Sequence, residues 1–210
     1  MLRNKESLMA NKLVVASNNS AKTNEIKNVF FEFGFEVVNY RELIDEKVFP
    51  VETTTNQYSN ALNKAKFIQH FLPDENILAD DTGAYFSAFP KRFGLATSRE
   101  LKALGLKSIS EEDNYLLNLY TSELDRSAYL EALFILVTPT GKIFKSIGKG
   151  GVTLAHSERG SYSVGFDTLF EAENSKTFAE MPMAERVIYS HRGRAAEKLV
   201  KKINQNLYEQ

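Results

Sequence analysis

The feature that most constrains the fold of this chain is a short apolar run that ends in a polar loop and leads into a helical pattern. Leu13-Val14-Val15-Ala16 stops at Ser17-Asn18-Asn19-Ser20, and apolar side chains then recur at helical spacing as far as Phe33. This order predicts a strand, a loop and a helix. Gly34 is expected to end the helix, and residues 35–40 to form a second strand.

The same alternation continues along the chain. The further predicted elements are a helix over 58–72 that Pro73 stops, a brief buried strand over 77–79, a helix over 111–124, strands over 129–138 and 142–147 around the turn Pro139-Thr140-Gly141, and a last helix from about Ser190. Ser190 is the expected N-cap of that last helix. Strand–loop–helix units together with a hairpin predict an α/β fold with a mixed central β-sheet flanked by helices.

Length and composition place this fold in one domain. With 210 residues and 43% hydrophobic side chains, the chain has enough apolar mass for a core, and we expect a single domain over 12–210 after a flexible extension over 1–11. The formal net charge of −1 argues against a protein that coats nucleic acid or an anionic membrane. The absence of cysteine excludes disulfides and thiolate metal sites. With no apolar secretory segment at the start, we expect a cytoplasmic protein.

Two polar segments follow predicted strands. Ser17–Lys22 stands where a strand leads into a helix, so its short side chains either cap the helix or help its backbone N–H groups and Lys22 to bind phosphate. Asp80-Asp81-Thr82-Gly83 follows the strand over 77–79. Its two adjacent carboxylates either bind a hard cation such as Mg²⁺ or belong to an exposed turn before Gly83.

Two more segments lie in the C-terminal part of the chain. Ser190–Arg194 places His191 and Arg192 in the first turn of a helix, where cations oppose the helix dipole, so the segment is either an anion site or a solvated basic face. Ser161–Asp167 joins Gly165 to an aromatic ring and a carboxylate, and Phe166 is either a core residue or a surface on which a purine stacks.

In their order and spacing, these segments resemble the motifs of the inosine triphosphate pyrophosphatase family, also called the Ham1-like family. Ser17–Lys22 is similar to the family's Thr/Ser-Gly/Asn-Asn-x-x-Lys loop, and Asp80–Gly83 to its Asp-Asp-Ser-Gly motif. Val164–Asp167 is similar to its Phe-Gly-Tyr-Asp motif, and Ser190–Ala195 to its Ser-His-Arg-x-x-Ala motif. The resemblance extends from about Leu13 to Leu207.

The resemblance implies a mixed sheet in two lobes with the nucleotide cleft between them. It also implies hydrolysis of non-canonical purine nucleoside triphosphates (ITP, dITP and XTP) to the monophosphate and pyrophosphate. Mg²⁺ would be held by Asp81 and Glu52, Asp81 would accept a proton from the attacking water, and Asp80 would orient it. The implied substrate-binding residues are Ser17, Asn18, Asn19, Lys22, Thr82, Gly165, Phe166, Asp167, Arg186, His191 and Arg192. Among them, Phe166 would stack on the purine, and His191 and Arg192 would donate hydrogen bonds to its 6-oxo group.

The resemblance further implies a homodimer, while the near-neutral charge predicts no polymeric nucleic acid and no membrane as partner. Five positions depart from the family pattern: Ser59 stands where a Glu is expected, Phe93 precedes Gly94 where a Pro is expected, Phe166 replaces Tyr or Trp, Thr168 replaces Pro, and Arg186 replaces Lys. These departures leave two alternatives open, a nucleotide-binding protein without catalysis and a pyrophosphatase for a different base. The near-neutral charge itself is interpreted as a cancellation between acidic residues over 74–81 and basic residues over 186–202.

Overall fold

The structure is a computed structural model that describes residues 11–122 and 125–208. Of the expected N-terminal extension, residues 1–10 lie outside the described residues. Contacts within the chain group it into two compact units. Unit 1 comprises residues 1–81, 133–147 and 195–210, and unit 2 comprises residues 82–132 and 148–194.

The secondary structure confirms the α/β prediction. The elements are β1 (Lys12–Val15), α2 (Ser20–Phe31), β2 (Glu36–Asn39), η1 (Tyr40–Glu42), α3 (Gln57–Gln69), β3 (Ile77–Phe86), α4 (Thr97–Ala103), α5 (Ile109–Leu119), β4 (Ala128–Val137), β5 (Ile143–Gly150), β6 (Thr153–Leu154), η2 (Gly165–Thr168), β7 (Phe170–Glu171), η3 (Phe178–Glu180), α6 (Met183–Tyr189) and α7 (His191–Tyr208), where η marks a 3₁₀ helix. Five strands form a sheet in the order β2-β1-β3-β4-β5, and β6 pairs with β7. β1 is parallel to β2 and β3, whereas β4 and β5 form the predicted hairpin around Gly141.

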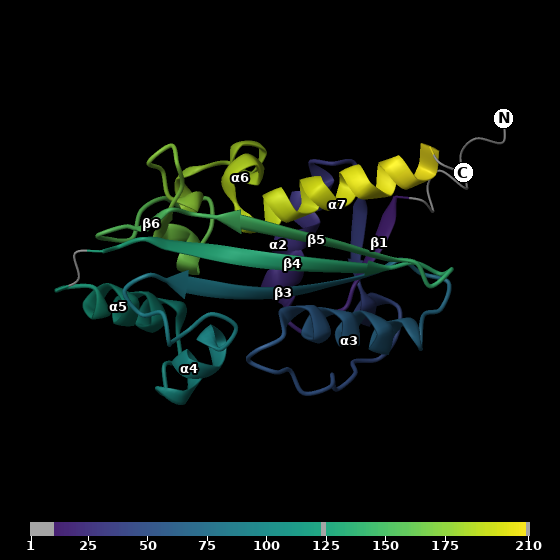
Figure 1. Cartoon of the computed structure of the whole chain (residues 1–210), viewed down its shortest axis with the longest axis horizontal. Helices are drawn as coiled ribbons and strands as arrows, with labels where there is room; N and C mark the ends of the chain where they lie inside the picture. Colours follow the sequence, from purple (N-terminus) through teal and green to yellow (C-terminus); the bar gives the residue numbers. More distant parts are fainter. Residues whose placement is uncertain (1–10, 123–124, 209–210) are drawn as a thin grey trace. The chain divides into compact units, whose positions relative to one another are not determined.

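The core of unit 1 follows from the alternation of side chains along its strands. On one face of the sheet, Ile135 shares a buried cluster with Ala61 of α3. The neighbouring residue Phe134 points to the other face, where its ring centroid lies 5.5 Å from that of Phe30 in α2. Helices therefore cover both faces, and Figure 1 shows α3 and α7 on opposite sides of the strands.

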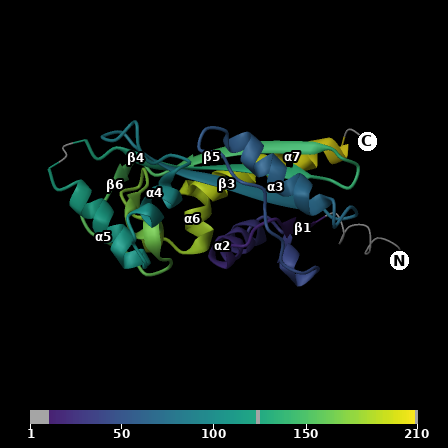
Figure 2. The same ribbon diagram turned by 90° about the horizontal axis from the view of Figure 1, so that it is seen from below.

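Unit 2 has a core of its own that is rich in aromatic side chains. The ring of Phe86 in β3 lies 5.7 Å from that of Phe170 in β7 and 6.0 Å from that of Tyr120, measured between centroids. Leu101 of α4 and Leu116 of α5 belong to the same cluster. Figures 1 and 2 both show α4 and α5 near each other at the C-terminal end of β3.

The prediction for Asp80 and Asp81 was wrong in its local structure. They were expected in a loop after a strand over 77–79, but β3 continues through them to Phe86. The physical reason lies downstream, because Ala84 and Phe86 are buried in the core of unit 2 and hold the chain extended. The two carboxylates are therefore consecutive residues of a buried strand, and an exposed turn at this position is excluded.

Smaller differences concern the helices. α5 ends at Leu119 rather than at residue 124, and the short helices α4 and α6 were not predicted. The N-cap prediction for Ser190 is confirmed, since its Oγ accepts a hydrogen bond from Gly193 N at 3.1 Å. Among the described residues, no helix has the length and apolar character needed to cross a membrane.

Candidate active site

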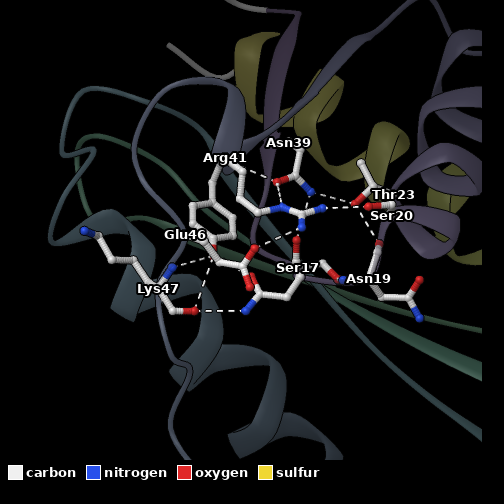
Figure 3. A network of polar contacts seen from close by, with 10 residues as sticks. Ser17, Asn19, Ser20, Thr23, Asn39, Arg41, Glu46 and Lys47 are labelled. Carbon is white, nitrogen blue, oxygen red and sulfur yellow. Dashed lines mark hydrogen bonds and ion pairs between the residues drawn. The ribbon is translucent and has the colours of Figure 1, made fainter.

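In unit 1, the polar loop after β1 is fixed by residues at the end of β2 (Figure 3). Asn39 donates through Nδ2 to the Ser17 carbonyl at 2.9 Å and to Thr23 Oγ1 at 2.7 Å. Arg41 donates through Nη2 to Ser20 Oγ at 2.8 Å. Because β1 and β2 are parallel, their carboxyl ends meet at the same edge of the sheet, and these contacts fix the loop there.

The loop side chains singled out from the sequence have structural partners. Asn19 caps α2, its Oδ1 accepting from Lys22 N at 3.0 Å, and Ser17 Oγ accepts from Asn19 N at 3.1 Å. Asn18 donates through Nδ2 to the Lys47 carbonyl at 2.9 Å and accepts from the Tyr40 hydroxyl. These side chains therefore shape the loop, while the backbone N–H groups at the start of α2 form the kind of site that binds phosphate.

Asp80 is almost fully buried and is matched by two lysines. Lys22 Nζ lies 3.2 Å from its Oδ2, and Lys64 of α3 donates from Nζ to its backbone carbonyl at 2.7 Å. A buried carboxylate is costly unless a cation or donors compensate it, and the lysines supply that compensation. Asp80 thereby fixes the position of the Lys22 ammonium group.

Asp81 points to the other side of β3 and is held by two amides of α3. Asn60 Nδ2 donates to its Oδ2 at 3.0 Å, and Gln57 Nε2 donates to its backbone carbonyl at 3.0 Å. Burial raises the pKa of the Asp81 carboxyl, an effect that Lys64 and the hydrogen bond from Asn60 oppose and that Glu52 reinforces. A carboxylate with a raised pKa is a better proton acceptor, as a general base requires.

The residues around Asp81 also suit a divalent cation. Glu52 acts electrostatically on Asp81 and forms an ion pair with Lys64 at 2.7 Å. Within 11–122 and 125–208 there is no group of three or more His, Cys, Asp or Glu residues able to hold a metal ion. Two carboxylates without a closed cage fit Mg²⁺, which usually binds proteins through one or two carboxylates and takes its other ligands from phosphate and water.

In unit 2, the start of α7 brings Arg192 to β3. Arg192 donates through Nη2 to Thr82 Oγ1 at 3.2 Å, so two residues that are distant in the sequence meet. His191 is 1% exposed, and its ring centroid lies 6.3 Å from that of Phe178. The backbones pack closely here, because a Cβ on Gly150 would come within 2.3 Å of His191 N.

A second pair in unit 2 joins α6 to η2. Arg186 Nη1 lies 2.8 Å from Asp167 Oδ2, and both side chains are largely buried. Gly165 has a φ of +69°, a conformation that favours glycine and starts the 3₁₀ turn. Phe166 is partly buried against the core of unit 2, with its ring centroid 6.0 Å from that of Phe170. Arg186 thus orders the segment that carries Phe166.

Sequence reasoning missed the contribution of α3. Gln57, Asn60 and Lys64 recur at helical spacing and contact the backbone or side chains of Asp80 and Asp81. The signal that could have revealed them is a polar stripe next to the apolar stripe of Ala61 and Ala65 on the same helix.

Comparisons with known proteins identify the family of this chain. The Ham1 family model matches residues 13–202. The dihydroneopterin triphosphate diphosphatase of Limosilactobacillus reuteri is 33% identical over 202 residues, covering 94% of this chain and 100% of that protein. The dITP/XTP pyrophosphatase of Borreliella burgdorferi (strain ZS7) is 27% identical over 201 residues, covering 93% and 98%.

A solved structure shows the same relationship at the level of the fold. The Ham1 protein of Staphylococcus aureus superimposes with a TM-score of 0.75 at 25% identity, covering 93% of this chain and 99% of that one. A family model that spans nearly the whole chain, together with relatives matched over almost their full lengths, establishes the relationship. The chain belongs to the Ham1 family.

Proposed function

We propose that this protein hydrolyses non-canonical purine nucleoside triphosphates (ITP, dITP and XTP) to the monophosphate and pyrophosphate. The observation that carries the proposal is Asp81, a buried carboxyl with a raised pKa that lies near the cations of Lys22 and Lys64. Water attacks the α-phosphorus, the bond from that phosphorus to the bridging oxygen breaks, and pyrophosphate leaves. Relatives named dITP/XTP pyrophosphatase support this assignment.

In unit 1, Asp81 takes the proton from the attacking water. Asn60 holds one carboxylate oxygen and so orients the group. Asp80 places the Lys22 ammonium group, which stabilises the charge that develops on the phosphate oxygens. Asp81 and Glu52 would also hold Mg²⁺. When bound, the ion neutralises the triphosphate and polarises the scissile phosphorus.

Unit 2 supplies recognition of the base. Phe166 stacks on the ring, and Arg186, paired with Asp167, keeps the segment of Phe166 in place. His191 and Arg192 donate hydrogen bonds to the 6-oxo group. Adenine carries an amino donor at that position, which would leave these buried donors unpaired, so ATP is a poor substrate.

A second candidate substrate is dihydroneopterin triphosphate. The relative in L. reuteri named for that substrate has a higher identity than the dITP/XTP pyrophosphatase of B. burgdorferi, at 33% against 27%. Hydrolysis of dihydroneopterin triphosphate would use the same chemistry at the phosphates as hydrolysis of ITP. The two substrates differ in the ring that unit 2 must recognise.

Pyrophosphate release from ITP, dITP, XTP, dihydroneopterin triphosphate and ATP, with and without Mg²⁺, tests the proposal. We expect release from oxo-substituted rings only with the cation present and little from ATP. Arg192→Ala should lower kcat/KM for ITP more than for ATP. An unchanged ITP/ATP ratio would count against base recognition by Arg192, and binding without pyrophosphate release would identify a nucleotide-binding protein that lacks catalysis.

We further propose that the protein is a homodimer, as the family resemblance implies. Light scattering in solution should give twice the mass of one chain, and a mass equal to that of one chain would contradict this.

A further inference from the structure

Asp113 carries a buried carboxyl oxygen that accepts no hydrogen bond from any residue the structure describes. The residue is 2% exposed, and its Oδ1 has no partner within the part of the chain that the structure describes. On α5 it stands at helical spacing with the core residues Leu116 and Tyr120, a position that normally carries an apolar side chain. A buried carboxyl without a hydrogen-bond donor lowers the stability of the folded protein. In a protein that binds a ligand, such a group indicates that the ligand supplies the donor.

The position of Asp113 relates it to base recognition. α5 packs against η2, which carries Gly165, Phe166 and Asp167. Ile109, one helical turn before Asp113, has its Cγ2 3.5 Å from the place where a Cβ on Gly165 would lie. The hydroxyl of Ser163, just before η2, is also buried and has no hydrogen-bond partner among the described residues. Two unsatisfied polar groups therefore lie near the segment assigned to the base.

The missing donor at Asp113 is better supplied by N–H groups than by a metal ion. The described residues contain no cluster of three metal-binding side chains. Glu112 on the same helix and Glu158 before η2 are the charged groups that act on Asp113, and Asp167 of η2 is paired with Arg186. Burial, with smaller contributions from Glu158 and Glu112, raises the pKa of Asp113 to about 7.

We propose that Asp113 determines which ring the site accepts, and this role rests on the proposed function. Asp113 accepts hydrogen bonds from a ring N–H and from an adjacent amino group of the substrate. The 2-amino-4-oxo ring of dihydroneopterin presents both donors, and its oxo group is available to His191 and Arg192. Inosine presents a single N–H beside a C–H. Xanthine carries an oxygen at position 2, which a carboxylate repels. The inference favours the pterin triphosphate over XTP as substrate.

The test compares kcat/KM for dihydroneopterin triphosphate, ITP and XTP in the wild type, Asp113→Asn and Asp113→Ser. We expect the wild type to prefer the pterin substrate. Asp113→Asn should lower its kcat/KM about tenfold or more, because a charged acceptor is lost, while kcat/KM for XTP rises, because the new amide donates to the 2-oxo group. Asp113→Ser should lose the preference for the pterin substrate, but its kcat/KM for XTP should not rise. Glu112→Gln is the matched control. Measured well above pH 7, where Asp113 is ionised with or without the neighbouring charge, it should leave the ratios unchanged.

A pH series gives an independent readout. The wild-type preference for the pterin substrate over XTP should increase as pH rises through about 7, since the ionised carboxylate accepts both hydrogen bonds. The preference of Asp113→Asn should be flat over the same range. Equal changes on all three substrates, or a wild-type preference for XTP, would overturn the inference. If the wild type releases pyrophosphate from none of them, it is the proposed function that fails.

Discussion

At the scale of single residues, the site depends on how buried charges are compensated. Asp80 and Asp81 are neighbours in the sequence, but they point to opposite sides of β3 and meet different partners. Asp80 is neutralised by Lys22, whereas Asp81 is held by an amide of Asn60 and keeps a raised pKa. Burial therefore gives two adjacent carboxylates two different tasks, one in positioning a lysine and one in proton transfer.

Replacing Asp81 by Asn should abolish turnover while the fold is retained. The change keeps the size and the contact with Asn60 but removes the proton acceptor, so we expect kcat for ITP to fall by about 10² or more. Pyrophosphate release measures the loss, and circular dichroism checks the fold. Asp74→Asn, the same change at an exposed position, is the control. Normal turnover by Asp81→Asn would remove Asp81 from the mechanism.

At the scale of elements, the helix ends place the recognition residues. α7 begins directly after α6, with Ser190 as the N-cap between them. Gly193 allows the close approach of the two helices, since a Cβ there would lie 1.9 Å from the Val187 carbonyl oxygen. His191 and Arg192 occupy the positions between this cap and this glycine. The orientation of both side chains therefore depends on the geometry of the first turn.

Ser190→Ala should destabilise the protein through the loss of one capping bond. The bond from Gly193 N to Ser190 Oγ disappears, and caps of this kind contribute about 1 kcal/mol. Ser190→Gly should cost a similar amount, because Ser190 is 2% exposed and water cannot replace the lost bond at this buried helix end. Urea unfolding of the two variants measures the loss. An unchanged free energy of unfolding in both would show that the hydroxyl does not act as a cap.

At the scale of the whole molecule, charged residues that are far apart in the sequence form ion pairs. The near-neutral net charge, interpreted from the sequence as a cancellation between an acidic stretch and a basic helix, is a count of formal charges, and the structure adds where single charges are paired. In unit 1, Asp80 pairs with Lys22. In unit 2, Arg194 pairs with Glu173 at 2.9 Å. Both pairs join residues that are distant in the sequence, so the fold decides where these charges are compensated.

Because a ligand that binds only the folded protein stabilises it, a bound substrate analogue together with the cation should raise the melting temperature. A non-hydrolysable ITP analogue with Mg²⁺ at about 100 times Kd should raise Tm by about 5–10 °C. Scanning fluorimetry measures the shift. The analogue without Mg²⁺ should give a smaller shift, and Asp81→Asn should reduce the part that depends on the metal. The same Tm with and without the cation would contradict metal-assisted binding.

Much of the fold and part of the site were predictable from local patterns. The strand–loop–helix at Leu13, the hairpin and the cap at Ser190 depend on neighbouring residues, and the structure confirms them. The continuation of β3 through Asp80 and Asp81 was not predictable in this way. It depends on the burial of Phe86 in the core of unit 2 and on cations from α2 and α3.

The sequence by itself determined the α/β class, the order of the elements and the motifs that resemble those of the Ham1 family, because periodicity and spacing are local properties. The tertiary structure decided which buried charges are compensated. It paired Asp80 with Lys22 and left Oδ1 of Asp113 with no donor from residues 11–122 and 125–208. The physical reason is that the cost of a buried charge depends on the groups that surround it in space, and those groups come from distant parts of the chain.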